Sequence, residues 1–480
     1  MNFDDILGLA RSASAVAEGW ITPPIRLGVT GLSRAGKTVF ITALVHNLLQ
    51  GGRLPFFAAA AQGRLVRAFL EPQPDDGVPR FAYEDHLATL TATPPDWPES
   101  TRRISQLRLT LEFEPLGYLR RQLGTARQHV DIVDYPGEWL LDLPLLRQSY
   151  EDWAQDAIAQ SREPQRAAFA AQWHAFLTDC DPATPAAEPT AMQGAELFTA
   201  YLRRCRSDPN LLSTLTPGRM LMPGDLQGSP ALTFMPLDVA RGTTAPSASL
   251  HAMMARRFEA YKSHVVKPFF RDHFARLDRQ IVLVDVLSAI NVGPSALADL
   301  ERAITAVLQS FRPGANSWLS SILGKRIDRI LFAATKADHI HHTSHDRLEA
   351  ILRQSVNKAI DRALFAGAEV KAVALAAVRA TREVEAEEGG EALNCIAGTP
   401  LPGEPLDGET FDGRQEIALF PGDLPREIDG LVSIPEGGAG VRFLRFRPPA
   451  LRASGFGAQA ALPHIRLDRA IEFLIGDRLE

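Results

Sequence analysis

The stretch from Gly31 to Thr38 reads GLSRAGKT and fits G-x-x-x-x-G-K-T, the pattern of a phosphate-binding P-loop. Residues 25–30, directly before it, form a short, mostly apolar and partly β-branched run that is typical of a buried parallel strand. Residues 39–50, directly after it, are mostly apolar and are followed by two glycines, which is typical of a helix and its end. These flanking elements are what phosphate binding requires, and they disfavour the alternative of a glycine-rich turn with a stray lysine.

The P-loop residues have distinct expected roles. Backbone N–H groups of the loop hold phosphate oxygens, assisted by the positive end of the helix dipole. Lys37 brings a positive charge to the β- and γ-phosphates, and the Thr38 hydroxyl is placed to ligate Mg²⁺. The residues predicted to bind the phosphates are Ser33, Arg34, Ala35, Gly36, Lys37, Thr38 and Val39.

A second motif, Asp134-Tyr135-Pro136-Gly137, ends the predicted strand 129–134. A carboxylate at this strand end lies beside the P-loop threonine and helps to hold Mg²⁺. The N–H group of Gly137 can approach a γ-phosphate because no Cβ blocks it. D-x-x-G alone is a common turn, but its place after a P-loop and at a strand end favours the nucleotide-binding interpretation.

A third motif, Thr335-Lys336-Ala337-Asp338, follows the apolar run 329–334. The Asp338 carboxylate can accept hydrogen bonds from N1–H and the 2-amino group of guanine, whereas adenine has neither donor on that edge. The aliphatic stem of Lys336 can lie over the purine ring. The alternative, an exposed strand end, is disfavoured by the order of the three motifs along the chain.

Two other groups of residues lie near the third motif in the predicted fold. The turn after the last apolar strand contains Val378 and Arg379, which are placed to close over the base. His339, His341 and His342 resemble a metal-binding cluster, but their loop position without a nearby cysteine favours an interpretation without metal.

The composition narrows the class of protein. With 480 residues the chain is long for one domain, which predicts a core domain with large additions. The net charge of −6 offers no general attraction to nucleic acid, so no nucleic-acid partner is expected. The cysteines are few and scattered, which favours a reducing, cytoplasmic compartment and argues against a disulfide framework or a zinc site; they are Cys180, Cys205 and Cys395.

No membrane-spanning helix is expected, because no run reaches about 18 uninterrupted apolar residues. Residues 1–5 are acidic where a signal peptide would be basic. Apolar residues at helical spacing predict an amphipathic helix over residues 3–19, and its acidic polar face favours packing on the protein over binding to a membrane surface.

The whole pattern predicts an α/β protein of the P-loop nucleoside-triphosphatase class. Residues 280–287, 329–334 and 369–376 are expected to be central, parallel strands, whereas 106–113 and 129–134 are close enough in sequence to pair antiparallel. We predict an N-terminal helix (1–20), a discontinuous P-loop core (21–137 and 276–381), a helical insertion (138–275), a small β-rich addition (382–463) and a C-terminal helix that packs on the core (464–480).

With all three motifs in place, the chain resembles the TRAFAC class of GTPases, and more closely the YcjX-like family of bacterial P-loop proteins associated with stress. Four blocks carry this resemblance: residues 31–40, 134–140, 269–285 and 334–339. The resemblance implies a Ras-like, mostly parallel sheet flanked by helices, which binds GTP or GDP with Mg²⁺. It also implies a link to envelope stress, a membrane or regulatory protein partner that meets the helical insertion, and a place in the cytoplasm or at the inner membrane.

The sequence departs from a Ras-like enzyme at Glu138, where those GTPases carry the glutamine that orients the attacking water. A carboxylate facing the γ-phosphate would be repelled, so slow intrinsic hydrolysis is expected. Thr101 is the candidate for the loop threonine that senses the γ-phosphate and ligates Mg²⁺. The alternatives to Thr101 are Thr91, Thr93 and Ser105, and one of Arg34, Arg102 or Arg103 could neutralise transition-state charge. The predicted catalytic residues are Lys37, Gly137, Glu138 and Thr101. The predicted metal ligands are Thr38, Thr101 and Asp134.

The motifs and the family resemblance together imply three candidate functions, and the link to a stress response comes from the resemblance alone. The first is a GTPase with slow turnover that acts as a conformational switch in a stress response. The second is a regulatory module in which the nucleotide holds a conformation, the helical insertion grips a partner and turnover is negligible. The third is an ATP-using P-loop enzyme, against which the Thr335–Asp338 motif argues.

Overall fold

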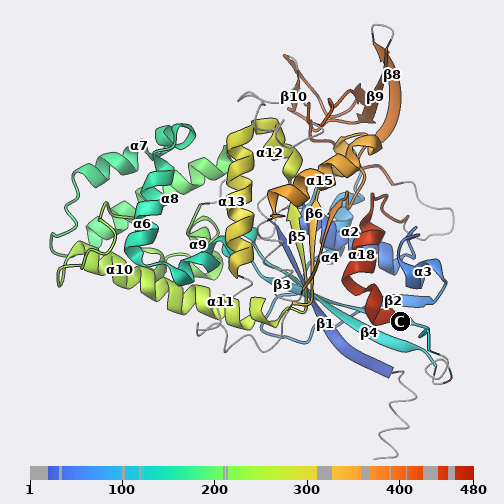
Figure 1. Ribbon diagram of the computed structural model, residues 1–480, viewed down its shortest axis with the longest axis horizontal. Coiled ribbons are helices and arrows are strands. Elements are labelled where there is room, and N and C mark those ends of the chain that lie inside the picture. Colours follow the sequence, from blue (N-terminus) through green and yellow to red (C-terminus); the bar gives the residue numbers. More distant parts are fainter. Residues whose placement is uncertain are drawn as a thin grey trace, which may run out of the picture.

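A seven-stranded sheet carries all three motifs at one edge. Its strand order is β2-β3-β4-β1-β5-β6-β7, in which β4, β1, β5, β6 and β7 run parallel and β3 pairs antiparallel with both β2 and β4 (Figure 1). The strands are β1 (Trp20–Gly31), β2 (Leu65–Glu71), β3 (Ser105–Phe113), β4 (Ala126–Asp134), β5 (Arg279–Val284), β6 (Arg329–Ala334) and β7 (Glu369–Ala374). This computed structural model describes residues 20–31, 35–99, 103–117, 122, 124–208, 211, 215–310, 327–357, 368–388, 391–406, 408–424, 442–451 and 460–480.

Helices cover both faces of the sheet, as the alternation of side chains along each strand requires. In β5, Ile281 and Leu283 pack into the cluster that contains α2 and α18, whereas Val282 and Val284 pack into the cluster on the opposite face. The helices on the first face are α2 (Lys37–Leu49), α3 (Ala58–Ala61), α4 (Tyr83–Leu90) and α18 (Leu467–Ile475); those on the second are α12 (Val286–Val292), α13 (Pro294–Ser310) and α15 (His345–Ser355). The α/β fold class and the antiparallel pairing of β3 with β4 are therefore confirmed.

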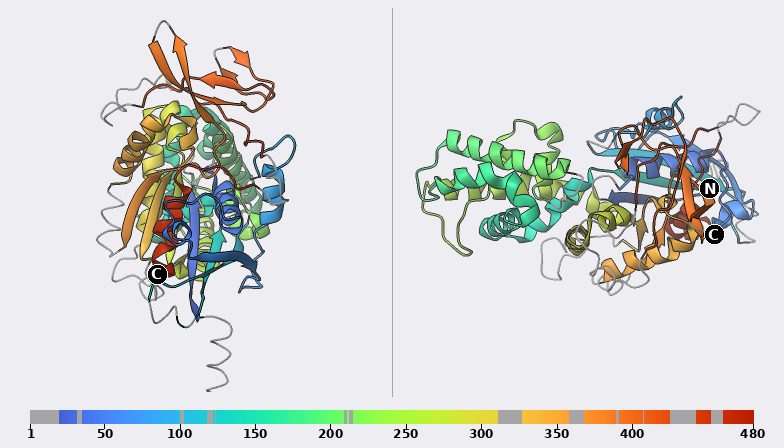
Figure 2. Two further views of the ribbon diagram at one scale, coloured as in Figure 1. Left: turned by 90° about the vertical axis from the view of Figure 1, so that its right-hand side faces the viewer. Right: turned by 90° about the horizontal axis from the view of Figure 1, so that it is seen from above.

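A second group of helices forms its own core beside the sheet (Figure 2). The helices are α6 (Tyr150–Ser161), α7 (Pro164–Thr178), α8 (Glu188–Ser207), the short α9 (Gly218–Leu221), α10 (Leu250–Tyr261) and α11 (Lys267–Asp272). Trp153 stacks on Phe258 there with ring centroids 5.0 Å apart. A buried ion pair between Arg166 of α7 and Asp299 of α13 joins these helices to the sheet part.

The long helical stretch from Leu250 to Asp272 is irregular just before Pro268. A π-helical turn, Lys262–Val266, separates α10 from α11, and Pro268 follows it in the first turn of α11. The turn widens the helix before the proline is reached.

The C-terminal region is rich in β-structure, as predicted. β8 (Arg382–Glu388), which lies in the acidic run, pairs antiparallel with β9 (Glu391–Gly398), and β9 pairs with β12 (Ile417–Leu419). A two-stranded pair, β10 (Pro405–Leu406) and β11 (Glu409–Thr410), lies nearby. An isolated bridge pairs Pro400 with Phe446. The helix expected over residues 3–19 lies outside the described residues.

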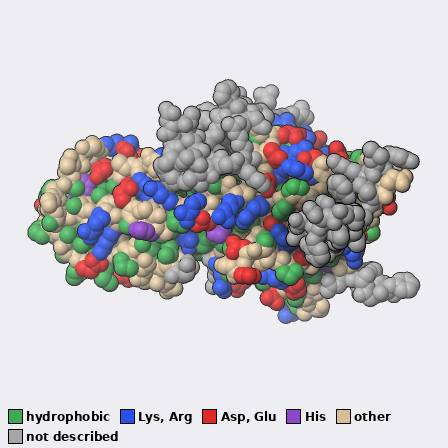
Figure 3. Space-filling model, turned by 90° about the horizontal axis from the view of Figure 1, so that it is seen from below, with side chains coloured by type: hydrophobic (Ala, Val, Ile, Leu, Met, Phe, Trp, Pro, Cys, Tyr) green, Lys and Arg blue, Asp and Glu red, His purple; other side chains and the backbone are tan. Residues whose placement is uncertain are grey.

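The surface shows a mixture of charges. On the face in Figure 3, lysine and arginine side chains are interspersed with acidic ones over both the helical part and the sheet part. None of the helices in the described part of the chain combines the length and apolarity that a bilayer crossing needs.

Candidate functional site

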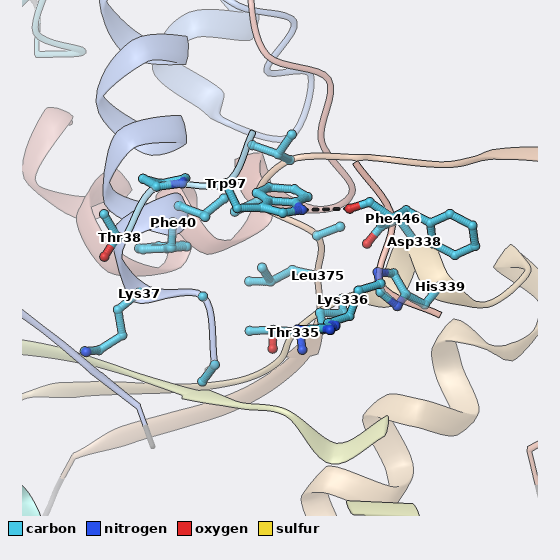
Figure 4. Close-up of a pocket in the computed structure, with 18 of the residues that line it drawn as sticks. Lys37, Thr38, Phe40, Trp97, Thr335, Lys336, Asp338, His339, Leu375 and Phe446 are labelled. Carbon is cyan, nitrogen blue, oxygen red and sulfur yellow. Dashed lines mark hydrogen bonds between the residues drawn. The ribbon is translucent and has the colours of Figure 1, made fainter. Parts of the chain in front are cut away.

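One cavity of about 410 Å³ brings the first and third motifs together at the carboxyl ends of the parallel strands. This size falls within the usual range of ligand sites, and crevices at this edge of α/β sheets are where ligands bind. Figure 4 shows Lys37 and Thr38 at one end of the cavity and Asp338 and His339 at the other. The lining residues are Ala35, Gly36, Lys37, Thr38, Val39, Phe40, Asp96, Trp97, Pro98, Thr335, Lys336, Asp338, His339, Leu375, Ala376, Ala377, Val378, Leu401, Arg445 and Phe446.

The P-loop end of the cavity is built on the start of α2. Gly36 has a φ of 81°, a left-handed conformation that glycine adopts without strain, and its carbonyl accepts the N–H of Phe40 at 2.8 Å. This turn directs the chain from β1 into the helix, so that Lys37 and Thr38 stand in its first turn. Ser33 and Arg34 lie outside the described residues.

The two predicted protein ligands of a magnesium ion that the structure describes are both oxygen donors. Thr38, 6% exposed, is in the first turn of α2, and Asp134, 1% exposed, ends β4 in register with Val29 of the neighbouring β1. A hydroxyl and a carboxylate are the hard oxygen ligands that Mg²⁺ prefers, so this donor set fits the ion.

The candidate for the loop threonine that senses the γ-phosphate, and the alternatives to it, have different surroundings. Thr101, together with Arg102, lies outside the described residues. The Thr91 hydroxyl donates to Leu87 O at 2.9 Å and so caps the end of α4. Ser105, at the start of β3, is in register with Asp134, the last residue of β4 and a predicted magnesium ligand.

At the base end of the cavity, neighbouring backbone and side-chain groups hold Asp338 in place. Asp338 is 4% exposed as a residue, and its Oδ2 accepts the N–H of Ala380 at 2.8 Å. The Thr381 hydroxyl donates to the Asp338 carbonyl oxygen. A carboxylate has about four acceptor positions, so capacity remains for two further hydrogen bonds from a ligand.

Lys336 is anchored from behind the cavity. It adopts a left-handed φ of 61°, and its ammonium group pairs with Oδ2 of Asp285 at the end of β5. Burial opposes ionisation of Asp285, but Lys336 and the Ser288 donors outweigh it and lower the pKa of this carboxyl. The pair fixes the direction of the lysine stem along the cavity wall.

Val378 and Arg379, the two residues predicted to close over the base, have different positions in the structure. Val378 lines the cavity, but Arg379 is not among its lining residues. The Arg379 guanidinium instead donates to Thr381 O at 2.9 Å, so it supports the turn rather than the cavity.

Sequence reasoning missed the residues that cover the cavity. Trp97, from a proline-rich loop, donates its indole N–H to Phe446 O at 2.7 Å (Figure 4), and Arg445 and Leu401 also line the cavity. An aromatic residue in a polar loop was the available signal for Trp97. Nothing in the sequence connects that loop with Phe446, which is 349 residues away.

Glu138 does not have the surroundings that the sequence suggested. It follows Gly137 at the start of a 3₁₀ segment, Gly137–Arg147, and is 7% exposed. Its Oε1 accepts a hydrogen bond from Nη2 of Arg206, in the last turn of α8, at 2.8 Å. The carboxylate charge is thus paired with the helical part.

Further contacts hold the same segment against the helical part. The Arg219 guanidinium lies 3.2 Å from the centroid of the Trp139 ring. Trp139 Nε1 donates to Met222 O at 3.1 Å. Gly218 packs so closely that a Cβ there would lie 1.9 Å from Glu138 O. Glu138 and Trp139, the two residues after Gly137, are therefore held in contact with the helical part.

Removing Arg206 should destabilise the protein more than removing Glu138. Arg206→Ala leaves the more buried Glu138 charge unpaired, whereas Glu138→Ala leaves Arg206, whose side chain is 27% exposed, within reach of water. We expect losses in unfolding free energy of about 2 and about 1 kcal/mol. Chemical denaturation of both variants, the double variant and the exposed-site control Arg203→Ala measures this; zero coupling in the double-mutant cycle would contradict the pairing.

Asp142 in the same segment makes stability depend on pH. It accepts hydrogen bonds from Tyr261 Oη at 2.5 Å and Gly218 N at 2.7 Å, and burial raises its pKa to about 6. Its pKa in the unfolded chain is about 3.9. The native state therefore holds the proton more tightly, and this contribution, complete below about pH 4, is lost as the pH rises through about 6.

We expect the unfolding free energy of the wild type, relative to Asp142→Asn, to fall by about 2 kcal/mol between pH 4.5 and pH 7. Denaturation of both proteins at the two pH values measures this change. A constant difference would show that Asp142 does not titrate in this range.

The chain matches one protein family over most of its length. The YcjX-like family, DUF463, matches residues 25–479. "Ras-like GTPase YcjX" of Escherichia coli (strain K12) is 38% identical over 98% of this chain and 99% of its own, and the protein of the same name from Shewanella oneidensis is 36% identical over 95% of each. A chain of a signal recognition particle receptor complex from Chaetomium thermophilum is similar with 12% identity and a TM-score of 0.24, over 77% of this chain and 94% of that one. By the extent of the family match and the identity to two relatives over almost their whole length, this protein belongs to the YcjX-like family.

Proposed function

We propose that this protein binds GTP and GDP, with Mg²⁺, in the cavity between α2 and the turn after β6. One observation carries the proposal: a single cavity joins the P-loop lysine and threonine to the buried carboxylate of Asp338. The names of the two relatives, both Ras-like GTPases, support it.

Each part of the nucleotide has a binding group in this arrangement. The start of α2 and Lys37 take the phosphates, and Asp338 accepts the guanine donors. The stem of Lys336, held by Asp285, and the Trp97 side chain offer apolar surface to the base. Thr38 and Asp134 hold the magnesium ion, which when bound neutralises phosphate charge.

We propose that unassisted hydrolysis is slow. Glu138 replaces the water-orienting glutamine, and its carboxylate is paired with Arg206. The second candidate function, a regulatory module with negligible turnover, is favoured by the attachment of Glu138 and Trp139 to the helical part. In either case the helical insertion, residues 138–275, transmits the nucleotide state to a partner; a role in stress response, in the cytoplasm or at the inner membrane, belongs to the same proposal.

Calorimetric titration of nucleotide-free protein with GDP and ADP in Mg²⁺ tests the proposal. GDP should bind at least tenfold more tightly, which corresponds to about 1.4 kcal/mol. Equal binding would contradict guanine recognition, and tighter ADP binding would favour the ATP-using enzyme.

Phosphate release from GTP then separates the two roles. Slow turnover supports the switch, absent turnover with normal affinities supports the regulatory module, and fast unassisted turnover contradicts both.

A further inference from the structure

Two histidines and a glutamate from distant parts of the chain meet beside the loop that carries Asp338. His341 and His342 follow this loop, and Glu383 stands in β8. His342 Nδ1 lies 2.9 Å and His341 Nε2 lies 3.9 Å from the same oxygen, Glu383 Oε2. The three ligand atoms all lie within 4.8 Å of one another, so one nitrogen of each ring faces one carboxylate oxygen.

Neighbouring groups fix these side chains in the required orientation. The other ring nitrogen of His341, Nδ1, is hydrogen-bonded to the Thr343 hydroxyl at 3.0 Å, which leaves Nε2 for a ligand. The other oxygen of Glu383, Oε1, accepts the backbone N–H of His342 at 3.2 Å and lies 3.7 Å from Arg379 Nη2. Outer contacts of this kind are typical of metal-ligating histidines and carboxylates.

We propose that His341, His342 and Glu383 bind one divalent transition-metal ion, with Zn²⁺ as the best match. Imidazole nitrogens with one carboxylate are a common zinc donor set, and three protein ligands leave a fourth position for water. Zinc bonds of about 2.0–2.1 Å in a tetrahedron place ligand atoms about 3.3 Å apart, which lies between the two measured distances.

Glu383 supplies a third metal ligand that the sequence around the two histidines does not contain. Glu383 is 41 residues from His342 in sequence, within an acidic run that gives no metal signal by itself. Pairing of β8 with β9 sets the position of Glu383, which the spacing of the histidines does not reveal.

A bound ion would connect the metal site to the base-reading loop. Thr381, two residues before Glu383, donates to the carbonyl oxygen of Asp338, and His341 is three residues after it. An ion that joins the two segments should restrain the loop, so GDP should dissociate more slowly with Zn²⁺ bound. This consequence rests on the proposed function, whereas metal binding does not.

Metal titration of the full chain, stripped with chelator and free of any histidine tag, tests the site. Co²⁺ serves as the absorbing probe, and Zn²⁺ is then added to displace it. The wild type should bind one ion, and His342→Ala and Glu383→Gln should bind it at least tenfold more weakly. Glu383→Gln keeps an acceptor for the N–H of His342, and His264→Ala removes an exposed histidine on the π-helical turn as the matched control.

The outcomes separate the two proposals. No stoichiometric binding by the wild type, or equal binding by His342→Ala and Glu383→Gln, would overturn the metal site, whatever the nucleotide result. A protein that binds the ion but no GDP would contradict the proposed function and leave the site standing. An unchanged GDP dissociation rate with Zn²⁺ bound would overturn the coupling between them.

Discussion

Replacing Lys37 by alanine is expected to weaken GDP binding about a hundredfold or more. The ammonium group stands in the first turn of α2, at the end of the cavity where the helix directs its N–H groups. A hydrogen bond to a charged group contributes about 1.5–3 kcal/mol, and an uncompensated phosphate charge adds to the loss. A total of about 3 kcal/mol corresponds to about two orders of magnitude in the dissociation constant.

The measurement is calorimetric titration of the variant with GDP in Mg²⁺. Lys371→Ala, which removes an exposed lysine on β7, is the matched control and should bind GDP normally. GDP binding within threefold of the wild type would mean that Lys37 does not contact phosphate. Because the proposed role of Lys37 is to meet a ligand, the unfolding temperature of the unliganded protein should change little.

Replacing Asp338 by asparagine is expected to weaken binding of the guanine nucleotide and to strengthen binding of the xanthine nucleotide. The carboxylate offers only acceptors to guanine, whereas the asparagine amide presents a donor that opposes the N–H groups of the base. The loss should be about 1.5–3 kcal/mol, or tenfold to a hundredfold in GDP affinity. Xanthine has a carbonyl in place of the 2-amino group, so xanthosine diphosphate should bind the variant more tightly than the wild type.

The gain of the xanthine nucleotide distinguishes recognition from damage. Asparagine retains an oxygen for the N–H of Ala380, so the local turn should be preserved. Asp96→Asn, a substitution of the same shape at another cavity-lining acid, should leave the preference for GDP unchanged. Loss of GDP binding in Asp338→Asn without a gain for xanthosine diphosphate would show that Asp338 only supports the loop.

The central part of the fold could be predicted because burial leaves a plain mark in the sequence. β5 and β6 are buried on both faces and therefore read as continuous apolar runs. β2 was missed because it is a half-exposed edge strand that lies among prolines. β8 was missed because its glutamates resemble a solvated acidic segment, whereas in the structure they stand on a strand that pairs antiparallel with β9.

The site was predictable only where one short motif contains the chemistry. Gly36, Lys37, Thr38 and Asp338 line the cavity as expected, because a loop between a strand and a helix determines their place. The partner of Glu138 was not predictable, since Arg206 belongs to another helix, 68 residues away. Such pairs depend on how helices pack together, which local spacing does not describe.

The central position of β1 has a consequence for how the protein is made. β1 ends at Gly31, but its neighbour β5 begins at Arg279, about 250 residues later. At about 5–20 residues per second, a ribosome needs on the order of 10–50 s to synthesise that interval. Throughout this interval, the side of β1 that will pair with β5 has no partner strand, and the loop that carries Asp338 has not been synthesised. The nascent chain therefore exposes an apolar strand edge until late in synthesis, and its folding should depend more on chaperones than that of a protein whose central strands are consecutive.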